Sequence, residues 1–323
     1  MNYYHNPLST ESYSADPCIV YDEVTGYYYY MYTQHIGLTI SRAKHLKDFP
    51  DNCEKREIFH AEGNCGVYNC LWAPELHRHP DGSWYVYTSG TYSTEHTNKG
   101  IFCLHSKTND PFGEWEFGGF LTKGTTCIDP SVYFDKKGQQ WICYTTVTRN
   151  HGQPLVIAKM KSPTEIAKTR KFIAKATLPW ELVPPYIKRR KIVEGPYFVE
   201  NDKHLFIVYS ANGCYSDDYC LGALELVGDD MLNPKSWKKL PQPVLSKGNG
   251  VYGPGHATFF HSPDGTEFWC AYHTLAYSNP RPGEHMTRRL NAQKVEFDKD
   301  GYIIPMKTVP HNVDYPAPSG EIE

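Results

Sequence analysis

Apolar and aromatic residues along this chain fall into short runs that brief polar turns separate. Five strongly β-prone runs cover residues 27–32, 84–87, 141–145, 205–209 and 268–272. A turn signal precedes each run: Thr25-Gly26, Asp81-Gly82, Lys137-Gly138, Asn201-Asp202 and Asp264-Gly265. A short strand-like segment that starts at a proline precedes each turn. Two such segments joined by a tight turn predict a β-hairpin, here five times over.

The prolines that open these units are evenly spaced. They stand at positions 17, 74, 130, 196 and 254, so successive units lie 57, 56, 66 and 58 residues apart. A third apolar run follows in each unit, at 37–41, 101–106, 155–160, 221–226 and 292–297, and a weaker fourth segment leads to the next unit. About four strands per repeat of this length is typical of a propeller blade. The sequence therefore predicts an all-β fold, one five-bladed β-propeller domain over residues 1–323, and a two-sheet sandwich would not need five equivalent units.

The sequence does not decide which of two segments closes the ring of blades. Either residues 1–14 or the tail after Pro305 could supply the sealing strand.

Composition agrees with many short strands and excludes some partners. The chain has 25 Tyr, 14 Phe and 7 Trp beside 25 Gly and 24 Pro, and its net charge is −3. This nearly balanced charge gives no nucleic-acid footprint and no basic membrane surface. The ten cysteines are scattered, the first residues are polar, and no apolar run is long enough to cross a membrane. We therefore predict reduced thiols and a cytoplasmic location.

The repeat also places acidic residues together. The first strand of every blade lines the channel, so equivalent positions converge near one axis. The position before the repeat proline is occupied by Asp16, Ala73, Asp129, Gly195 and Gly253, and Glu194 stands one residue earlier in the fourth unit. Carboxylates that lie close together raise one another's pKa. Hydrolysis of a glycosidic bond uses an ionised carboxylate as base and a protonated carboxyl as acid. The three small residues are expected to leave space for a sugar.

Five motifs of the chain together resemble glycoside hydrolase family 43. They are Ala15-Asp16-Pro17, Trp72-Ala73-Pro74-Glu75-Leu76, Ile128-Asp129-Pro130-Ser131, Val193-Glu194-Gly195-Pro196 and Tyr252-Gly253-Pro254-Gly255-His256. The resemblance implies hydrolysis with inversion on arabinose- or xylose-containing glycans. It makes Asp16 the general base, Glu194 the general acid and Asp129 the residue that raises the pKa of the acid and holds it in place. Inversion predicts that the Asp16 and Glu194 carboxyls lie roughly 6.5–9.5 Å apart.

Further residues are candidates for substrate binding. Trp72 is predicted to be a sugar platform, and Glu75 is predicted to bind a sugar hydroxyl or orient a neighbouring base. The resemblance places an arginine near substrate, either Arg288 or Arg289. It also places His256 near a channel calcium or a water network, and a satisfied buried histidine fits that position equally. We expect no required cofactor and leave open a calcium ion in the channel, reached through water from His256.

The resulting functional prediction is an inverting exo-glycosidase that releases terminal α-L-arabinofuranose from arabinan- or arabinoxylan-derived oligosaccharides. β-Xylosidase and endo-arabinanase are the alternatives within the family. A carbohydrate-binding propeller without activity is the alternative outside it. The expected partner is a pentose-containing oligosaccharide, with no nucleic acid and no membrane, and the oligomeric state stays open.

Overall fold

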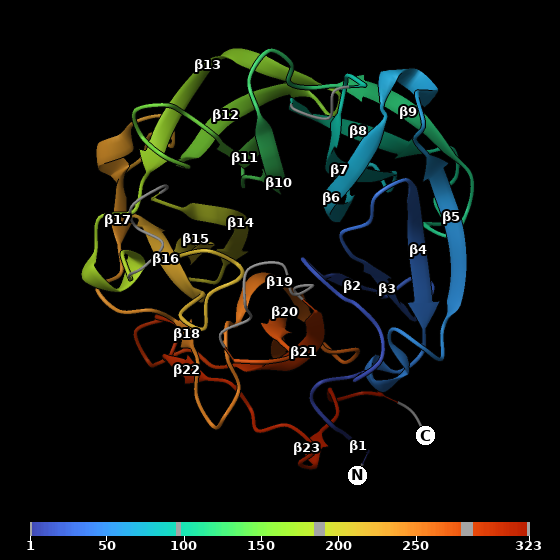
Figure 1. Ribbon diagram of the computed structural model, residues 1–323, viewed down its shortest axis with the longest axis vertical. Helices are drawn as coiled ribbons and strands as arrows, with labels where there is room; N and C mark the ends of the chain where they lie inside the picture. Colours follow the sequence, from blue (N-terminus) through green and yellow to red (C-terminus); the bar gives the residue numbers. More distant parts are fainter. Residues whose placement is uncertain (1, 95–97, 184–190, 279–286, 322–323) are drawn as a thin grey trace.

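The computed structural model of the protein describes residues 2–94, 98–183, 191–278 and 287–321. Five sheets, antiparallel except for one pair of short strands in blade 4, stand around a common axis (Figure 1). Their innermost strands are β2 (Cys18–Asp22), β6 (Asn69–Arg78), β10 (Cys127–Phe134), β14 (Val193–Glu200) and β19 (Gly255–His261). Each of these strands contacts the next, and β19 contacts β2, so the ring is complete. The predicted five-bladed β-propeller is confirmed.

The hairpins lie where the hydrophobic runs predict them. The second strands are β3 (Tyr27–Met31), β7 (Trp84–Thr91), β11 (Gln140–Thr146), β15 (Leu205–Ala211) and β20 (Phe268–Leu275). The third strands are β4 (Gly37–Ala43), β8 (Lys99–Ser106), β12 (Leu155–Ser162), β16 (Cys220–Leu226) and β21 (Arg288–Val295). Strand β21 begins earlier than the predicted start at residue 292. Its first residues are polar, so the apolar pattern does not mark them, yet Arg288 and Asn291 are buried here.

The outer strands differ from blade to blade. Blades 1 to 3 end in β5 (Glu54–His60), β9 (Trp115–Phe120) and β13 (Glu165–Ala174). Blade 4 is completed by the short strands β17 (Trp237–Lys239), β18 (Leu245–Ser246) and β22 (Met306–Lys307), of which β22 runs parallel to β18. The described helices are short turns, and none is long or apolar enough to cross a bilayer.

Each pair of neighbouring blades encloses one hydrophobic cluster. In β3, Tyr28 packs toward blade 5 beside Trp269, whereas Tyr29 packs toward blade 2 beside Trp84. Successive side chains of a strand point to opposite faces, and both faces of a blade are covered by its neighbours. This explains why the tyrosine run at 27–30 is continuously aromatic rather than alternating with polar residues.

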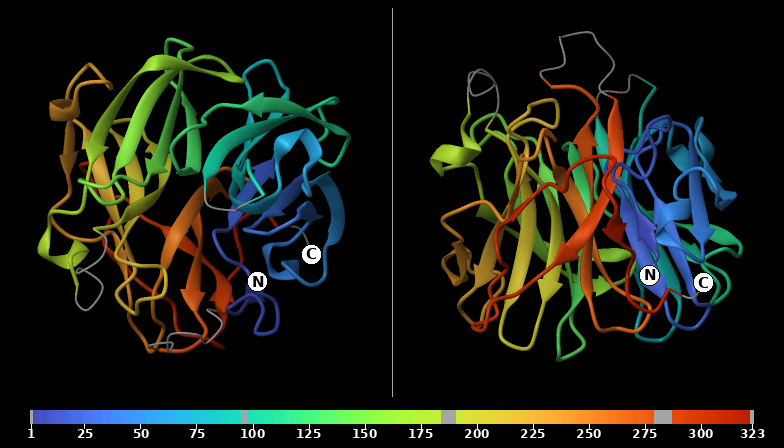
Figure 2. Two further views of the ribbon diagram at one scale, coloured as in Figure 1. Left: turned by 45° about the horizontal axis from the view of Figure 1, so that its top comes forward. Right: turned by 90° about the horizontal axis from the view of Figure 1, so that it is seen from below.

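Both ends of the chain take part in closing the ring. Residues 6–14 run beside β21, where the Leu8 and Ser14 N–H groups donate to the Leu290 and Arg288 carbonyls over 2.9 and 3.0 Å. At the other end, β23 (Tyr315–Pro316) pairs with β1 (Tyr3–Tyr4). Figure 2 shows the two ends of the chain close together beside blade 1. The N-terminal segment thus occupies the outer place of blade 5, and the C-terminal tail fastens it.

The residue before each repeat proline has a left-handed backbone. The φ angles are 52° at Asp16, 46° at Ala73, 55° at Asp129, 55° at Gly195 and 60° at Gly253. In blades 2 to 5 a register shift interrupts the pairing of the inner strand near this point. Such irregularities re-aim side chains and are frequent beside active sites.

For Gly195 and Gly253, the expectation that a small residue makes room for a sugar is wrong. A Cβ atom on Gly195 would lie 3.0 Å from His256 Nδ1, and one on Gly253 would lie 2.8 Å from Leu275 Cγ. The glycines therefore serve a left-handed, tightly packed backbone.

Candidate active site

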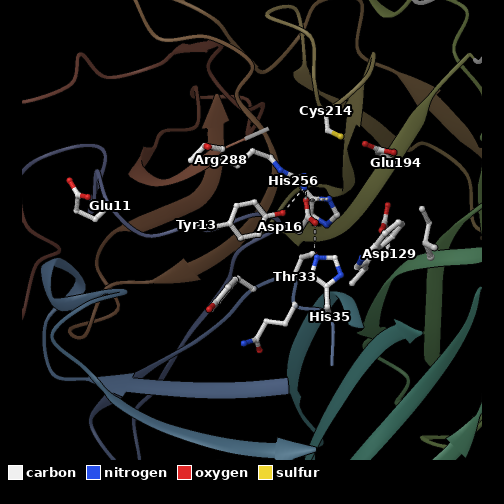
Figure 3. A pocket seen from close by; sticks show the side chains of 15 residues that line it. Glu11, Tyr13, Asp16, Thr33, His35, Asp129, Glu194, Cys214, His256 and Arg288 are labelled. Atoms are coloured by element: carbon white, nitrogen blue, oxygen red, sulfur yellow. Dashed lines mark hydrogen bonds and ion pairs between the residues drawn. The ribbon is translucent and has the colours of Figure 1, made fainter. Parts of the chain in front are cut away.

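All five blades contribute residues to one cavity of about 880 Å³. Six predicted residues line it: Asp16 before β2, Trp72 on β6, Asp129 on β10, Glu194 on β14, His256 on β19 and Arg288 on β21. Figure 3 shows that the carboxylates of Asp16, Asp129 and Glu194 lie around the same space, and each belongs to a different blade. The propeller thus gathers side chains that are far apart in the sequence.

Asp16 is surrounded by nitrogen atoms. Its Oδ1 lies 3.2 Å from Arg288 Nη1, 3.2 Å from His256 Nδ1 and 3.4 Å from His273 Nδ1. The Thr33 hydroxyl donates to Oδ2. Burial by itself would raise the pKa of this carboxyl, but the positive charge of Arg288 outweighs burial and holds the pKa well below its ordinary value. Asp16 is therefore an anion throughout the physiological range.

Glu194 has the opposite environment. Burial raises its pKa to about 7, against the hydrogen bonds from Tyr219 and Gln153, which lower it. The Tyr219 hydroxyl donates to Oε1 over 2.8 Å, and the Gln153 amide donates to Oε2. The negative charge of Asp16 also raises this pKa. Glu194 therefore keeps a proton near neutral pH.

Asp129 is the deepest of the three carboxyl groups, and its side chain is buried. Burial and the neighbouring charge of Glu194 raise its pKa, whereas a 3.1 Å hydrogen bond from the Gly195 N–H to Oδ2 opposes that rise. Two buried carboxyls that repel each other share protons, so their titration belongs to the pair. Asp129 is thus placed to influence the proton on Glu194.

The two histidines beside Asp16 are neutral. Burial lowers the pKa of His273 to about 4, and it also lowers the pKa of His256. The Asp16 N–H donates to His273 Nδ1 over 3.1 Å, so the proton of this ring lies on Nε2. Arg288 therefore provides the positive charge that faces Asp16.

Trp72 forms part of the cavity wall next to a lysine. Lys99 Nζ lies 4.3 Å from the centre of its ring. The indole is partly exposed to the cavity, where a ring face can stack on the C–H surface of a sugar.

Two predicted residues lie away from the cavity lining that the structure describes. Glu75 is buried on β6, and its Oε2 contacts His77 Nε2 at 2.7 Å. Arg289 donates from Nη1 to the Ser12 carbonyl over 3.1 Å and so holds the N-terminal segment. Of the two arginines, it is Arg288 that reaches Asp16. Roles of Glu75 and Arg289 in substrate binding stay predictions.

Several residues at the site were not predicted. Tyr219, Gln153 and His273 contact the carboxylates, and Tyr13 and Cys214 line the cavity. His273 had a signal: it pairs with Gly255, and the corresponding partners in blades 2 to 4 are Ser89, Thr145 and Ser210. Aligning second strands would have shown one histidine among hydroxyl residues. Tyr219 and Gln153 stand in irregular segments just before strands, where the repeat gives no such signal.

A family model described as Glycosyl hydrolases family 43 matches residues 4–303. The chain belongs to glycoside hydrolase family 43. The resemblance that its five motifs carry is thereby confirmed.

Individual relatives are similar over most of the chain. An extracellular exo-α-(1→5)-L-arabinofuranosidase of Streptomyces avermitilis is 32% identical over 92% of the chain, which spans 62% of that relative. A protein of the same description from Streptomyces chartreusis is 29% identical over 85% of the chain and 83% of its own length. The crystal structure of an α-L-arabinofuranosidase from Lactobacillus brevis superposes with a TM-score of 0.84 at 26% identity, covering 96% of this chain and 98% of that one.

The two Streptomyces relatives correct the predicted location. Both are described as extracellular, so the prediction of a cytoplasmic protein is wrong. It rested partly on unpaired cysteines, and all ten are indeed free. Most of them are buried or half-buried, where thiols are protected from oxidants, so they do not require a reducing compartment.

No group of three or more His, Cys, Asp or Glu side chains among the described residues is arranged to hold a metal ion. Near His256 the nearest carboxylate is Asp16, which already binds Arg288. Calcium takes roughly six to eight oxygen ligands. The residues described around His256 therefore do not fit a calcium site by themselves.

Proposed function

We propose that this chain is an inverting exo-glycosidase that releases terminal α-L-arabinofuranose from arabinan- or arabinoxylan-derived oligosaccharides. One observation carries the proposal: a carboxylate held as an anion, Asp16, and a carboxyl that keeps its proton to about pH 7, Glu194, line the same cavity. A base and an acid with separated pKa values are what an inverting glycosidase needs. The arabinofuranosidase relatives support the choice of sugar.

In the proposed reaction a water molecule attacks the anomeric carbon from the side of Asp16. Asp16 takes one proton from this water as its oxygen bonds to the carbon. On the opposite face, the bond between the anomeric carbon and the leaving oxygen breaks, and Glu194 gives its proton to that oxygen. Product release leaves Asp16 protonated and Glu194 ionised, and exchange with solvent restores both. A separation of roughly 6.5–9.5 Å between the two carboxyls stays a prediction of this scheme.

The neighbouring residues support these two roles. Arg288 keeps Asp16 ionised, and Asp129, a buried carboxyl that shares its titration with Glu194, is assigned the role of modulating the pKa of the acid. Trp72 provides a stacking surface for a sugar ring. The scheme needs no cofactor and no step through a metal, and calcium reached through water from His256 stays a prediction. We take residues 1–323 as one catalytic domain.

Two chromogenic substrates test the function. The protein is expected to hydrolyse nitrophenyl α-L-arabinofuranoside faster than nitrophenyl β-D-xylopyranoside, and NMR of the first product should show the inverted anomer. Preference for the xyloside would indicate a β-xylosidase, and activity confined to long arabinan would indicate an endo-arabinanase. Oligosaccharide binding without hydrolysis of any of them would make the chain a carbohydrate-binding propeller.

A further inference from the structure

The segment that closes the ring also forms part of the cavity wall. Residues 6–14 lie beside β21, and this segment sends Glu11 and Tyr13 toward the cavity. Arg289 donates to the Ser12 carbonyl, and the Ser12 hydroxyl donates to Asp51. The stretch around Tyr13 is therefore anchored on both sides of the residue: at Ser12, and at Ser14, whose N–H bonds to the Arg288 carbonyl.

Tyr13 contacts the arginine that faces the proposed base. Arg288 Nη2 donates to the Tyr13 hydroxyl over 2.8 Å, while Nη1 donates to Asp16 Oδ1 over 3.2 Å. The guanidinium carbon lies 5.6 Å from the centre of the Tyr13 ring. Figure 3 shows the side chains of Tyr13, Arg288 and Asp16 next to one another in the cavity.

The Arg288 guanidinium has few other restraints among the described residues. Its Nε atom is buried and has no hydrogen-bond partner there. The two outer nitrogens thus fix its orientation, one on the base and one on Tyr13. An arginine fork recognises its partners through this planar geometry, so loss of one partner frees the plane to turn.

We propose that Tyr13 is a positioning residue that holds the Arg288 guanidinium against Asp16, so that the ring-closing segment sets the environment of the general base. The inference rests on the proposed function in one respect, the role of Asp16 as base. The proposal gives residues 6–14, which lie outside the repeated units, a role in the site.

The other titratable groups around Asp16 determine how far its pKa can change when Arg288 is displaced. His256 and His273 face it from blade 5, and Asp129 and Glu194 face it from blades 3 and 4. Both histidines are neutral near pH 7, and burial and the negative charge of Asp16 raise the pKa of the two carboxyls, which hold their protons at the acidic pH where Asp16 titrates. Cys214 and Tyr219 also approach, and burial keeps both uncharged by raising their pKa values. Arg288 therefore dominates, and its displacement should raise the pKa of Asp16.

The test compares Tyr13→Phe, which keeps the ring, with Tyr13→Leu, which removes both ring and hydroxyl. Tyr302→Phe is the matched control, because the Tyr302 hydroxyl donates to the Glu225 carboxylate over 3.2 Å in a part-buried hydrogen bond, and neither residue lines the cavity. Activity needs ionised Asp16, so a raised pKa moves the acidic limb of kcat/KM to higher pH. We expect Tyr13→Phe to shift this limb by about half to one pH unit, which is roughly a three- to tenfold loss at the acidic end. Tyr13→Leu should shift it at least as far, and Tyr302→Phe should not shift it.

A second measurement separates this inference from the proposed function. Aspartate carboxyls labelled with carbon-13 can be titrated by NMR, and Asp16→Asn assigns the Asp16 signal. The Asp16 pKa should rise in Tyr13→Phe even if the wild-type protein hydrolyses neither nitrophenyl pentoside, a result that would defeat the proposed function alone. An unchanged Asp16 titration in both Tyr13 variants would overturn the inference. So would an activity loss that is equal at all pH values, because that indicates a plain substrate contact.

Discussion

Tyr219 donates a hydrogen bond from its hydroxyl to Oε1 of Glu194 over 2.8 Å. Its ring also stacks on His273, with ring centres 5.4 Å apart and planes 7° from parallel. His273 in turn accepts the N–H of Asp16. One tyrosine therefore joins the surroundings of the proposed acid to those of the proposed base.

Replacing this tyrosine should change the titration of the acid. The hydrogen bond from Tyr219 lowers the pKa of Glu194, so Tyr219→Phe should raise it and move the basic limb of kcat/KM upward, by about half to one pH unit. The pH dependence of kcat/KM for the variant measures the shift. A basic limb that stays in place or moves downward would show that Tyr219 does not stabilise the ionised form.

The wild-type profile itself is a prediction. Activity requires ionised Asp16 and protonated Glu194, so kcat/KM should be bell-shaped. It should fall above about pH 7, where Glu194 loses its proton, and it should persist below the ordinary pKa of an aspartate, because Asp16 is held well below that value. A plateau that extends to pH 9 would contradict the assignment of Glu194 as the acid.

Trp72 should act mainly in binding. Trp72→Ala removes the stacking surface of the cavity and should raise KM about tenfold or more, with a smaller effect on kcat. Trp72→Phe keeps a ring face and should give an intermediate KM. Steady-state kinetics on an arabinofuranosyl oligosaccharide measures both constants. Unchanged KM in Trp72→Ala would mean that the indole only packs the blade.

A buried ion pair that does not line the cavity should contribute strongly to the free energy of unfolding. Lys239 Nζ lies 2.5 Å from Oε1 of Glu181, a carboxylate whose side chain has no solvent exposure. Lys239→Met leaves this buried charge without its cation and should lower the free energy of unfolding by about 3–5 kcal/mol. Urea unfolding measures the change.

An exposed ion pair is the control for that comparison. Lys161 and Glu165 form a pair in which both side chains are about half exposed. Lys161→Met should cost less than about 1 kcal/mol. Equal effects of the two methionine variants would show that burial does not govern the strength of the Lys239 pair.

The repeated hairpins made much of the fold predictable from the sequence. Turn dipeptides and β-prone runs act locally, so β3 and β15 begin at the residues that the pattern gives. The polar start of β21 escaped the pattern, because Arg288 and Asn291 are buried although polar, and Arg288 is buried at the site rather than in the core. Polar residues at a functional site break the rule that otherwise marks a strand.

The site was predictable where it follows the repeat. Asp16 and Asp129 occupy equivalent places in two blades, and both carboxyls line the cavity. The left-handed backbone before each proline was not predicted, since an Asp-Pro pair alone does not specify it. Tyr13 comes from the ring-closing segment, and Tyr219 comes from the loop before β16, which folds back onto Glu194 within blade 4. The strand pattern marks neither segment.

The roles of Asp16 and Glu194 are tested most directly by comparing Asp16→Asn and Glu194→Gln on two substrates with different leaving groups. On an arabinofuranosyl disaccharide, whose leaving oxygen needs a proton, both variants should lose about 10²–10⁴-fold in kcat. On a dinitrophenyl arabinofuranoside, whose leaving group departs without a proton, Glu194→Gln should recover most of its rate and Asp16→Asn should stay inactive. Near-normal activity of Asp16→Asn on either substrate, or equal losses of Glu194→Gln on both, would contradict the assignment of base and acid.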